Sequence, residues 1–372
     1  MSTSKRPSPL FDWFIPIDGD GQHIGTRRAE RPPTFDYLRK VVDAAEGNGF
    51  HSLLIPTRFV NGLFEESAPL SETWTTVAAL AAVTKRIRFL VAVRPGFISA
   101  GLFAQMAATL DQISGGRLDI NVVPGGIQGD FERVGEKIDH HTRYARAEEF
   151  IESLRLLWER PLPTTFNGQY VSLEDAVVSP GVFNDGPRFY LGGASNDALQ
   201  LAGRQADVYL AWIHTKENIS SFIERANAKF SEAGRPARYG LRTHLVVRDT
   251  EAAAWDAAEE LIARADPEVH RQRQAVTSSS QMVGQKAQAQ VVKDYLLAPN
   301  LWNGISTVRV NCGTALVGTP DQVAAELRDY WRLGIDEFIL SGYPHIEECD
   351  RAATDLLPAT LSLIQEEGSL DA

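Results

Sequence analysis

Cysteine is almost absent from this sequence. Among 372 residues there are only two, Cys312 and Cys349, and they stand far apart in the chain. Such a pair provides neither a disulfide framework nor a zinc site. A reducing compartment is the simplest setting for a chain of this kind, so we expect a cytoplasmic protein without a bound metal.

Long apolar runs are also missing. No stretch approaches the roughly 18 apolar residues that a membrane-spanning helix needs, which makes a membrane an unsuitable partner. The first residues, MSTSKRPSPL, are polar and rich in Ser and Pro, without the apolar run of a signal peptide. We expect residues 1–10 and 367–372 to be flexible tails around one domain spanning 11–366.

Positive charge is in short supply. The formal net charge is -11 and the isoelectric point is about 5.3. A surface of this sign repels phosphate backbones and anionic lipids, so nucleic acid is a poor candidate partner. An anionic small molecule could still bind if a local cluster of positive side chains were present. Hydrophobic residues make up 44%, enough for a large folded core.

The common nucleotide-binding motifs are absent. No GxGxxG follows a strand-like run, and GxxxxGK[ST] does not occur. Rossmann and P-loop architectures therefore have no support from motifs.

Short apolar runs that alternate with helical patterns dominate the chain. Strands are predicted at Asp12–Ile17, Ser52–Ile55, Arg88–Val93, Leu118–Val123, Arg188–Leu191, Val208–Trp212, Tyr239–Val247 and Glu337–Ser341. Helices are predicted at Phe35–Gly47, Leu102–Ser114, Arg143–Trp158, Lys216–Ala233 and Ala324–Leu333. This α/β alternation favours a (β/α)8 TIM barrel with insertions, and an open doubly wound sheet is the alternative.

Two segments interrupt the alternation. Residues 57–70 form a long connection after the second strand. Residues 266–318 are rich in Gln, Ser, Arg and Lys, and no regular pattern accounts for their length. A long segment inside a compact domain is usually functional or disordered, and we expect residues 266–318 to close over the site as a lid.

Function in a barrel gathers at the C-terminal ends of the strands. Arg242 and His244 are two residues apart in the seventh strand, so they share one face and point toward the barrel interior if Leu241 and Leu245 pack outward. A buried arginine is costly unless it is paired. The pattern therefore predicts an anion site, with an ion pair in the barrel floor as the alternative.

Further polar residues follow other strand ends. Tyr343 and His345 share a parity after the last strand, although an ordinary loop can carry both. Trp212 ends the sixth strand and either plugs the barrel or forms a wall beside a flat ligand. Arg309 lies just before the Cys-Gly-Thr turn, where a surface position is the simpler interpretation.

A small-residue turn follows the fifth strand. In Gly192-Gly193-Ala194-Ser195 the backbone N–H groups can approach a phosphate at the start of a helix. The motif is short, and a tight turn without a ligand is the alternative.

Taken together and in this order, these segments resemble the bacterial luciferase-like flavin monooxygenases, and within them the two-component alkanesulfonate monooxygenases. The similarity runs from about Phe11 to about Pro358. It is carried by Phe14-Ile-Pro, Gly19-Asp-Gly, Leu54-Ile-Pro-Thr, Phe89 to Pro95, QMAATLDQISGG, Asp139-His-His-Thr-Arg-Tyr144, Gly192 to Ser195, Arg242-Thr-His244, Val308-Arg309, Gly313 to Gly318 and Leu340 to His345.

The resemblance implies an FMN-binding barrel. It places the phosphate on the turn of Gly193, Ala194 and Ser195 with Tyr144 nearby, and Asn121 beside the isoalloxazine. Reduced FMN would come from a separate NAD(P)H-dependent flavin reductase and react with O2, and a sulfonate substrate would yield sulfite and an aldehyde.

The resemblance also gives roles to the polar residues at the strand ends. Arg242 and Arg309 would hold the sulfonate. His244, Tyr343 and His345 would supply proton donors and acceptors, without a decision on which is the base. Trp212 would pack beside the substrate. We expect a homodimer or homotetramer.

The sequence departs from the alkanesulfonate enzymes around the expected pocket. Leu70 stands where those enzymes have a cysteine, Asp18 where they have a histidine, and the connection through Asn61 and Glu66 is longer. Asp18, Asn61 and Glu66 could accept hydrogen bonds from hydroxyl groups, so a sulfosugar such as sulfoquinovose is favoured over a simple alkanesulfonate. Competing hypotheses are a sulfone, pyrimidine or deazaflavin reaction in the same superfamily, and a flavin-storing protein without catalysis.

Overall fold

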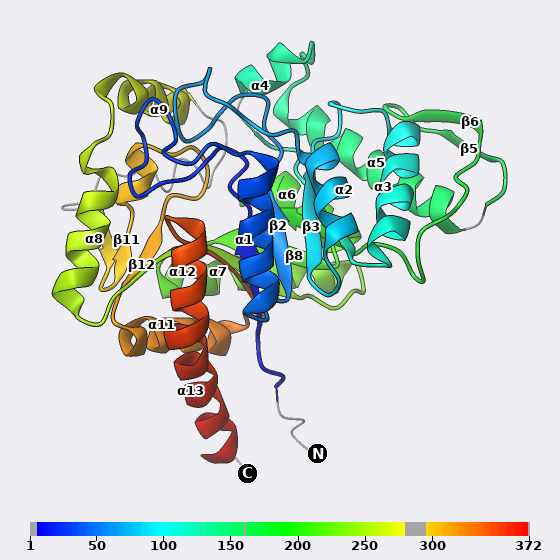
Figure 1. Ribbon diagram of the computed structural model, residues 1–372. Helices are drawn as coiled ribbons and strands as arrows, with labels where there is room; N and C mark the ends of the chain where they lie inside the picture. The colour runs from blue at the N-terminus through cyan, green and yellow to red at the C-terminus, as the bar shows by residue number, and fades with distance from the viewer. Residues whose placement is uncertain (1–5, 127, 160, 280–294, 371–372) are drawn as a thin grey trace.

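The computed structural model describes residues 6–126, 128–159, 161–279 and 295–370, and at its centre parallel strands close into a barrel (Figure 1). Within these residues the ring consists of eight strands. They are β1 Leu10–Phe14, β2 Ser52–Ile55, β3 Arg88–Val93, β4 Leu118–Val122, β7 Phe189–Gly192, β8 Val208–Trp212, β9 Tyr239–Val247 and β13 Glu337–Ser341. Strand β9 pairs with both β8 and β13, and β13 pairs with β1, which closes the ring. The predicted TIM barrel is confirmed and the open sheet is excluded.

Helices cover the outside of this ring. They are α1 Phe35–Gly47, α2 Thr73–Val83, α3 Ala100–Ser114, α5 His140–Glu159, α6 Asn196–Gln205, α7 Lys216–Glu232, α8 Glu251–Ala263, α11 Pro320–Leu333, α12 His345–Arg351 and α13 Leu357–Leu370. Helix α1 begins because the Thr34 side chain accepts a hydrogen bond from the Tyr37 N–H, and it buries Leu38, Val41 and Val42 on one face. Such an amphipathic stripe is what the 3.6-residue period predicted.

The core has two layers that follow the alternation of each strand. Inside the ring, Phe14, Leu54, Leu90, Tyr190 and Ile339 form one buried cluster with their neighbours. Residues of opposite parity pack outward against the helices in a second, larger cluster. Because successive side chains of a strand point to opposite faces, every strand supplies both layers.

The floor of the barrel is polar. Asp119 is fully buried and accepts hydrogen bonds from Arg88 and Arg188, each with a closest contact of 2.8 Å. Beside it lie two buried carboxyl groups, Asp12 and Glu337, and the Tyr190 hydroxyl donates to Glu337 at 3.1 Å. Burial, and then the nearby charge of Glu337, raise the pKa of Asp12 well above its ordinary value.

Several expected boundaries were wrong. Strand β1 ends at Phe14 and not at Ile17, because Pro16 has no N–H to continue the ladder. The N-terminal tail is shorter than 1–10, since Leu10 belongs to β1 and the Arg6 guanidinium forms an ion pair with Asp336 at 3.1 Å. Helix α13 continues to Leu370, which includes part of the expected tail 367–372.

Residues 266–318 are more ordered than the expected lid. Helix α9 covers Pro267–Ser279, followed after the gap by β10 Leu296–Ala298, β11 Leu301–Trp302, a short 3-10 helix Gly304–Thr307 and β12 Ala315–Gly318. Strand β12 extends the barrel sheet by pairing in parallel with β9, so these residues belong to the scaffold. Residues 280–294, which the lid expectation also includes, lie outside the described residues.

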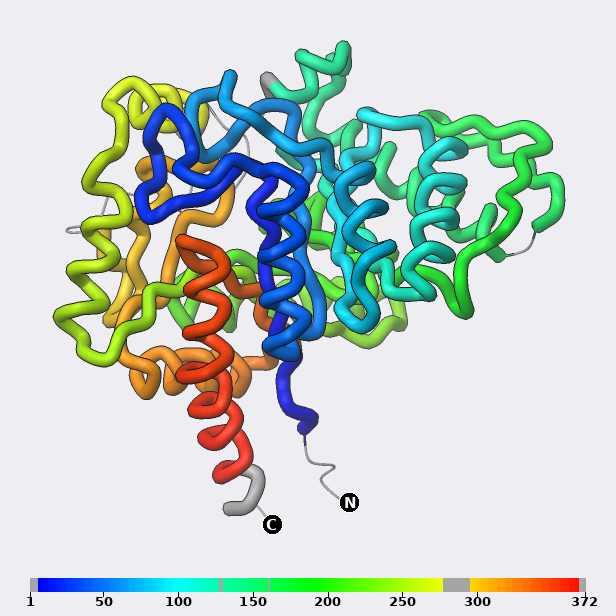
Figure 2. The backbone as a smooth tube through the Cα atoms, in the orientation of Figure 1, coloured from blue at the N-terminus to red at the C-terminus, as the bar shows by residue number. Residues whose placement is uncertain are grey.

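A second insertion was not foreseen. Strands β5 Thr164–Asn167 and β6 Ser172–Ala176 form an antiparallel hairpin that projects at one side of the molecule, visible in the tube drawing (Figure 2). Helix α4 Gln128–Arg133 and helix α9 lie near the opposite end of the barrel from the two termini (Figure 1). Among the described residues, no helix is both long enough and apolar enough to cross a bilayer.

We predict that Asp12→Asn becomes progressively more stable than the wild type as pH rises. A carboxyl group whose pKa is raised by folding stabilises the fold at low pH and loses that contribution as pH passes above its unfolded value of about 4. The difference should grow by up to about 1.4 kcal/mol per pH unit until the folded-state pKa is reached. Urea unfolding between about pH 5 and 8 measures it.

Asp119→Asn is the matched control on the same floor. Burial opposes the charge of Asp119, but hydrogen bonds from Arg188 and Arg88 hold its pKa below the ordinary value. The pKa shift of Asp119 therefore has the opposite sign to that of Asp12. Removing that charge should destabilise the protein by roughly 3–5 kcal/mol at neutral pH. An Asp12→Asn variant that loses stability to the same degree would contradict our account of the floor.

Candidate active site

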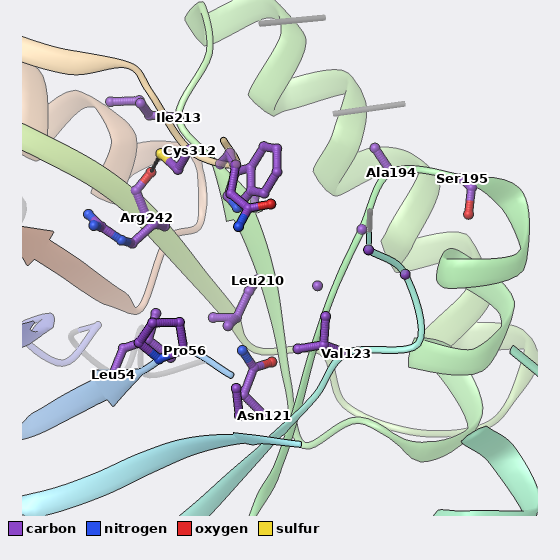
Figure 3. A pocket seen from close by; sticks show the side chains of 18 of the residues that line it. Leu54, Pro56, Asn121, Val123, Ala194, Ser195, Leu210, Ile213, Arg242 and Cys312 are labelled. Atoms are coloured by element: carbon purple, nitrogen blue, oxygen red, sulfur yellow. Dashed lines mark hydrogen bonds between the residues drawn. The ribbon is translucent and has the colours of Figure 1, made fainter. Parts of the chain in front are cut away.

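One cavity of about 360 Å³ opens at the C-terminal ends of the barrel strands. Its walls come from most strands of the ring, as the close view shows (Figure 3). Figure 3 also shows that Arg242 and the turn of Ala194 and Ser195 lie on opposite sides of this space, with Asn121 below it. The cavity therefore has a cationic end and a small-residue end.

The small-residue end is a turn that admits no side chain at its centre. Gly193 has φ +143°, and a Cβ there would lie 2.7 Å from the Cβ of Ala198 and 3.4 Å from the Tyr144 hydroxyl. Ser195 caps helix α6 by accepting a hydrogen bond from the Ala198 N–H at 3.2 Å. The start of α6 thus faces the cavity beside Tyr144, an arrangement that suits an anionic group.

The middle of the cavity carries an unsatisfied polar atom. Oδ1 of Asn121, on β4, is buried and has no hydrogen-bond partner among the described residues, although its side chain lines the cavity. Leu210, Val123 and the half-buried Trp212 line the same space. A buried amide oxygen between apolar walls can accept a hydrogen bond from a flat heteroaromatic ring.

The cationic end holds two buried guanidinium groups. Arg242 is 4% exposed and Arg309 is 3% exposed. Both guanidinium carbons lie over the ring of Phe14, at 4.7 and 5.4 Å from its centroid. Within the part of the chain that the structure describes, neither forms an ion pair with a carboxylate, so this end carries uncompensated positive charge.

Neutral groups hold these arginines in place. Arg242 donates to the Ser341 hydroxyl at 2.7 Å, and Ser341 lies 2.8 Å from Nδ1 of His244. Nε2 of His244 is 3.0 Å from the Cys312 carbonyl oxygen, which can only accept. The proton of the imidazole therefore sits on Nε2, Ser341 donates to Nδ1, and both nitrogens are engaged inside the protein.

Charge and burial act together on this network. Burial, and then the charge of Arg309, lower the pKa of Arg242 to about 10. Burial, followed by the charges of Arg242 and Arg309, holds the pKa of His244 well below its ordinary value. His244 is thus a neutral positioning group for Arg242 in the resting structure.

Tyr343 and His345 lie behind the cavity wall. Arg309 donates to the Tyr343 hydroxyl, and Tyr343 stacks on His244 with ring centroids 5.5 Å apart. His345 packs edge-on against Tyr343 at 4.9 Å, and its Nδ1 lies 3.1 Å from the Asp20 carboxylate.

The predicted site residues divide into two groups. Arg242, Arg309, Trp212, Asn121, Tyr144, Gly193, Ala194 and Ser195 line the cavity, whereas His244, Tyr343 and His345 form a layer behind it.

Three further arginines line the cavity, and none of them was among the predicted site residues: the exposed Arg225 of α7, and Arg58 and Arg94, whose side chains are buried. Arg58 follows β2 and lies 3.2 Å from the Asp18 carboxylate, and Arg94 follows β3 and lies 3.1 Å from Asp130. Burial lowers the pKa of both guanidinium groups. Their positions just beyond strand ends were the available signal, but helix–strand patterning does not show which loop residues turn inward.

The hydroxyl acceptors expected for a sugar are already engaged. Asp18 binds Arg58 and accepts the Gly62 N–H at 2.8 Å. The Asn61 side chain is fully buried, donating to Asp18 and Pro69 carbonyls and accepting from Leu63 and Phe64. Glu66 pairs with Arg133 at 2.7 Å outside this cavity. All three bind other protein groups and none of them lines this cavity, which corrects the expectation that they face a substrate here.

The barrel thus brings a helix N-terminus, a buried amide and a pair of buried arginines together around one cavity. The chain belongs to the luciferase-like monooxygenase family, whose model matches residues 10–337. It is therefore a flavin-dependent monooxygenase. No group of three or more metal-ligating side chains is found among the described residues.

Solved structures share the fold over nearly the whole chain. A riboflavin lyase with modified FMN and riboflavin has a TM-score of 0.79 at 19% identity, covering 97% of this chain and 92% of that one. An EDTA monooxygenase from Chelativorans has a TM-score of 0.72 at 18% identity, covering 97% of this chain and 95% of that one. A third structure is the oxygenating component of 3,6-diketocamphane monooxygenase from Pseudomonas putida in complex with FMN. Its TM-score is 0.70 at 16% identity, covering 95% of this chain and 99% of that one.

We predict that the His244 imidazole is still neutral, with its proton on Nε2, at a pH where an ordinary histidine is half protonated. Its carbonyl partner fixes the tautomer, and the two arginines oppose a second proton. Nitrogen NMR of isotopically labelled histidine, assigned with His244→Gln, measures this. His23 is the control, because hydrogen bonds to Glu30 and Glu260 raise its pKa above the ordinary value. A His244 signal that titrates near the ordinary pKa of about 6.5 would show that the network is wrongly assigned.

Proposed function

We propose that this enzyme uses reduced FMN and O2 to oxidise a small organosulfonate, breaking its C–S bond to give sulfite and an aldehyde. In the balanced reaction one oxygen atom of O2 becomes the aldehyde oxygen and the other leaves as water. Reduced FMN, when bound, supplies the two electrons for this step. The observation that carries the proposal is the pair of buried guanidinium groups, Arg242 and Arg309, without a carboxylate partner among the described residues.

The residues of the cavity fit FMN. The turn of Gly193, Ala194 and Ser195 at the start of α6 would take the phosphate, as N–H groups at a helix N-terminus favour an anion. Tyr144 adds a hydroxyl at the same end. The unpartnered Oδ1 of Asn121 would accept a hydrogen bond from a ring N–H of the flavin.

The arginine pair would then bind the sulfonate at the other end. Planar guanidinium groups match a tetrahedral oxyanion through paired N–H donors, and burial strengthens each contact. The same fixed charges stabilise negative charge that develops during oxygen transfer. Trp212 would pack beside the substrate and help to exclude water.

The layer behind the wall would support the two arginines. Tyr343 contacts Arg309 directly, and burial raises its pKa while the arginine charges oppose that rise. His345 connects Tyr343 to the Asp20 carboxylate. We propose that Tyr343, supported by His345, keeps Arg309 in position, and that His244 does the same for Arg242.

The structure changes the expected substrate preference. Because Asp18, Asn61 and Glu66 bind other protein groups, they do not favour a sugar over a plain alkyl chain. Sulfoquinovose therefore has no advantage from these residues, and simple alkanesulfonates are equal candidates. A sulfone or a pyrimidine would leave both arginines without a counter-charge, which disfavours them.

The reaction requires a source of reduced flavin. We propose a separate NAD(P)H-dependent flavin reductase as the partner, a cytoplasmic setting where NAD(P)H is present, and assembly as a homodimer or homotetramer.

We predict that the enzyme releases sulfite when it is mixed aerobically with FMN, NADH, a flavin reductase and the right sulfonate. The panel contains sulfoquinovose and alkanesulfonates of increasing length. Arg242→Ala should lower kcat/KM about a hundredfold or more while FMN still binds, because the anion loses a buried cation.

Arg264→Gln is the control for this prediction, since Arg264 is 68% exposed and remote from the cavity lining. Absence of sulfite across the panel would remove the proposed function. Full activity in Arg242→Ala would show that the anion binds elsewhere.

We predict that Ser195→Ala weakens the binding of FMN about tenfold and leaves that of riboflavin unchanged, because only FMN carries the phosphate. Fluorescence quenching of either flavin measures the dissociation constants. Thr250→Ala is the matched control, since Thr250 caps helix α8 by the same contact, from the Ala253 N–H at 3.2 Å. Equal weakening of both flavins would place the phosphate away from this turn.

A further inference from the structure

A second cavity of about 220 Å³ lies beside the first. The two share one lining residue, Arg58. The second cavity is bounded by the connection after β2, by α4, by α9 and by Val310, the neighbour of Arg309. It therefore lies next to the end of the first cavity that holds Arg242 and Arg309, with Arg58 between the two cavities.

Arg58 occupies the boundary because a glycine leaves room for it. A Cβ on Gly62 would overlap Nη1 of Arg58 and lie 2.7 Å from its Cζ. The guanidinium thus rests on the Gly62 backbone, with its side chain only 4% exposed and its charge balanced by Asp18 at 3.2 Å. The positive charges of Arg309 and Arg58 are close enough that Arg309 lowers the pKa of Arg58.

The charges around the second cavity do not balance. Arg133 pairs with Glu66, and Asp130 pairs with Arg94. Arg273, on α9, is 2% exposed and lines the same cavity. Within the described part of the chain Arg273 forms no ion pair with a carboxylate; its guanidinium donates to the carbonyl oxygens of Asn61, at 3.2 Å, and of Phe64. Its Nε is buried and has no hydrogen-bond partner in the described ranges.

The hydrogen bonds of Arg273 to the two carbonyl oxygens do not require a charged side chain. A neutral amide side chain could donate to a loop carbonyl, whereas burying a cation without a counter-charge costs several kcal/mol. Among the residues that the structure describes, Arg273 is thus a third buried guanidinium near Arg242 and Arg309 without a carboxylate partner. In a chain with net charge -11, such a group suits a second negative charge that arrives from outside.

We propose that the second cavity binds a second anionic group of the substrate, so that the preferred substrate is an organic dianion. One end, the sulfonate, would bind Arg242 and Arg309, and the other, a carboxylate or a second sulfonate, would bind Arg273 and Arg58. This proposal rests on the proposed function and specifies its substrate class.

The test compares substrates matched in length. Ethanesulfonate, propanesulfonate and butanesulfonate are each paired with the sulfocarboxylate of the same chain length, from sulfoacetate upward, and with the corresponding disulfonates. Sulfite release gives kcat/KM for each. We expect the dianion to exceed its monoanionic partner about tenfold or more at the chain length that spans the two cavities.

Three variants separate charge from structure. Arg273→Gln should lower the ratio between dianion and monoanion to near one, whereas Arg273→Lys, which keeps the charge, should retain most of it. Arg271→Gln on the same helix is the control, because Arg271 is 71% exposed and pairs with Glu268. Gly62→Ala displaces Arg58 and should also lower the ratio.

The outcomes are distinct. A dianion that is not preferred at any length, or an Arg273→Gln variant that lowers both substrates equally, would overturn the second subsite and show a structural role for Arg273. If no sulfonate releases sulfite, the proposed function fails, and calorimetry then decides the subsite independently. In that case the binding of dianions and monoanions to the protein loaded with oxidised FMN is compared. Tighter binding of the dianions that is lost in Arg273→Gln would uphold the second subsite, and equal binding of dianions and monoanions would reject it.

Discussion

The site depends on two buried cations that neutral groups hold in place. Arg242 and Arg309 donate to a serine hydroxyl and to a tyrosine hydroxyl, and both lie over the ring of Phe14. Carboxylate partners would neutralise these side chains and leave nothing for a substrate to bind. Because hydroxyls and an aromatic face only orient them, their charge remains directed at the cavity.

The layer behind the cavity explains how such an arrangement remains folded. The Cys312 carbonyl fixes the tautomer of His244, His244 orients Ser341, and Ser341 receives Arg242. Each hydrogen bond in this series joins a donor to an acceptor, so these polar groups are satisfied although the cation is not neutralised. The barrel supplies rigid strand ends for this purpose, since Arg242, His244 and Ser341 belong to the adjacent strands β9 and β13.

The two ends of the cavity divide recognition between backbone and side chains. At the α6 end, small residues expose backbone N–H groups, and Gly193 is required because any Cβ would collide with Ala198. At the other end, long cationic side chains reach the cavity from strand β9 and from the loop before β12. This division allows a family of common fold to keep one cofactor cradle while the substrate end varies with its loops.

The sequence by itself determined the barrel, because strand and helix periods are local properties that eight βα units repeat. It also indicated that Arg242 faces the cavity, since residues two apart on a strand share a face. The turn of Gly193 and Ser195 was found because small residues before a helix have a local signature. Only the tertiary structure showed that Arg58, Arg94 and Arg273 turn inward and that Asp18 and Asn61 serve the fold. Loop side chains have no period, so their direction is decided by packing between segments that are distant in the chain, as the contact between Arg273 of α9 and the connection after β2 illustrates.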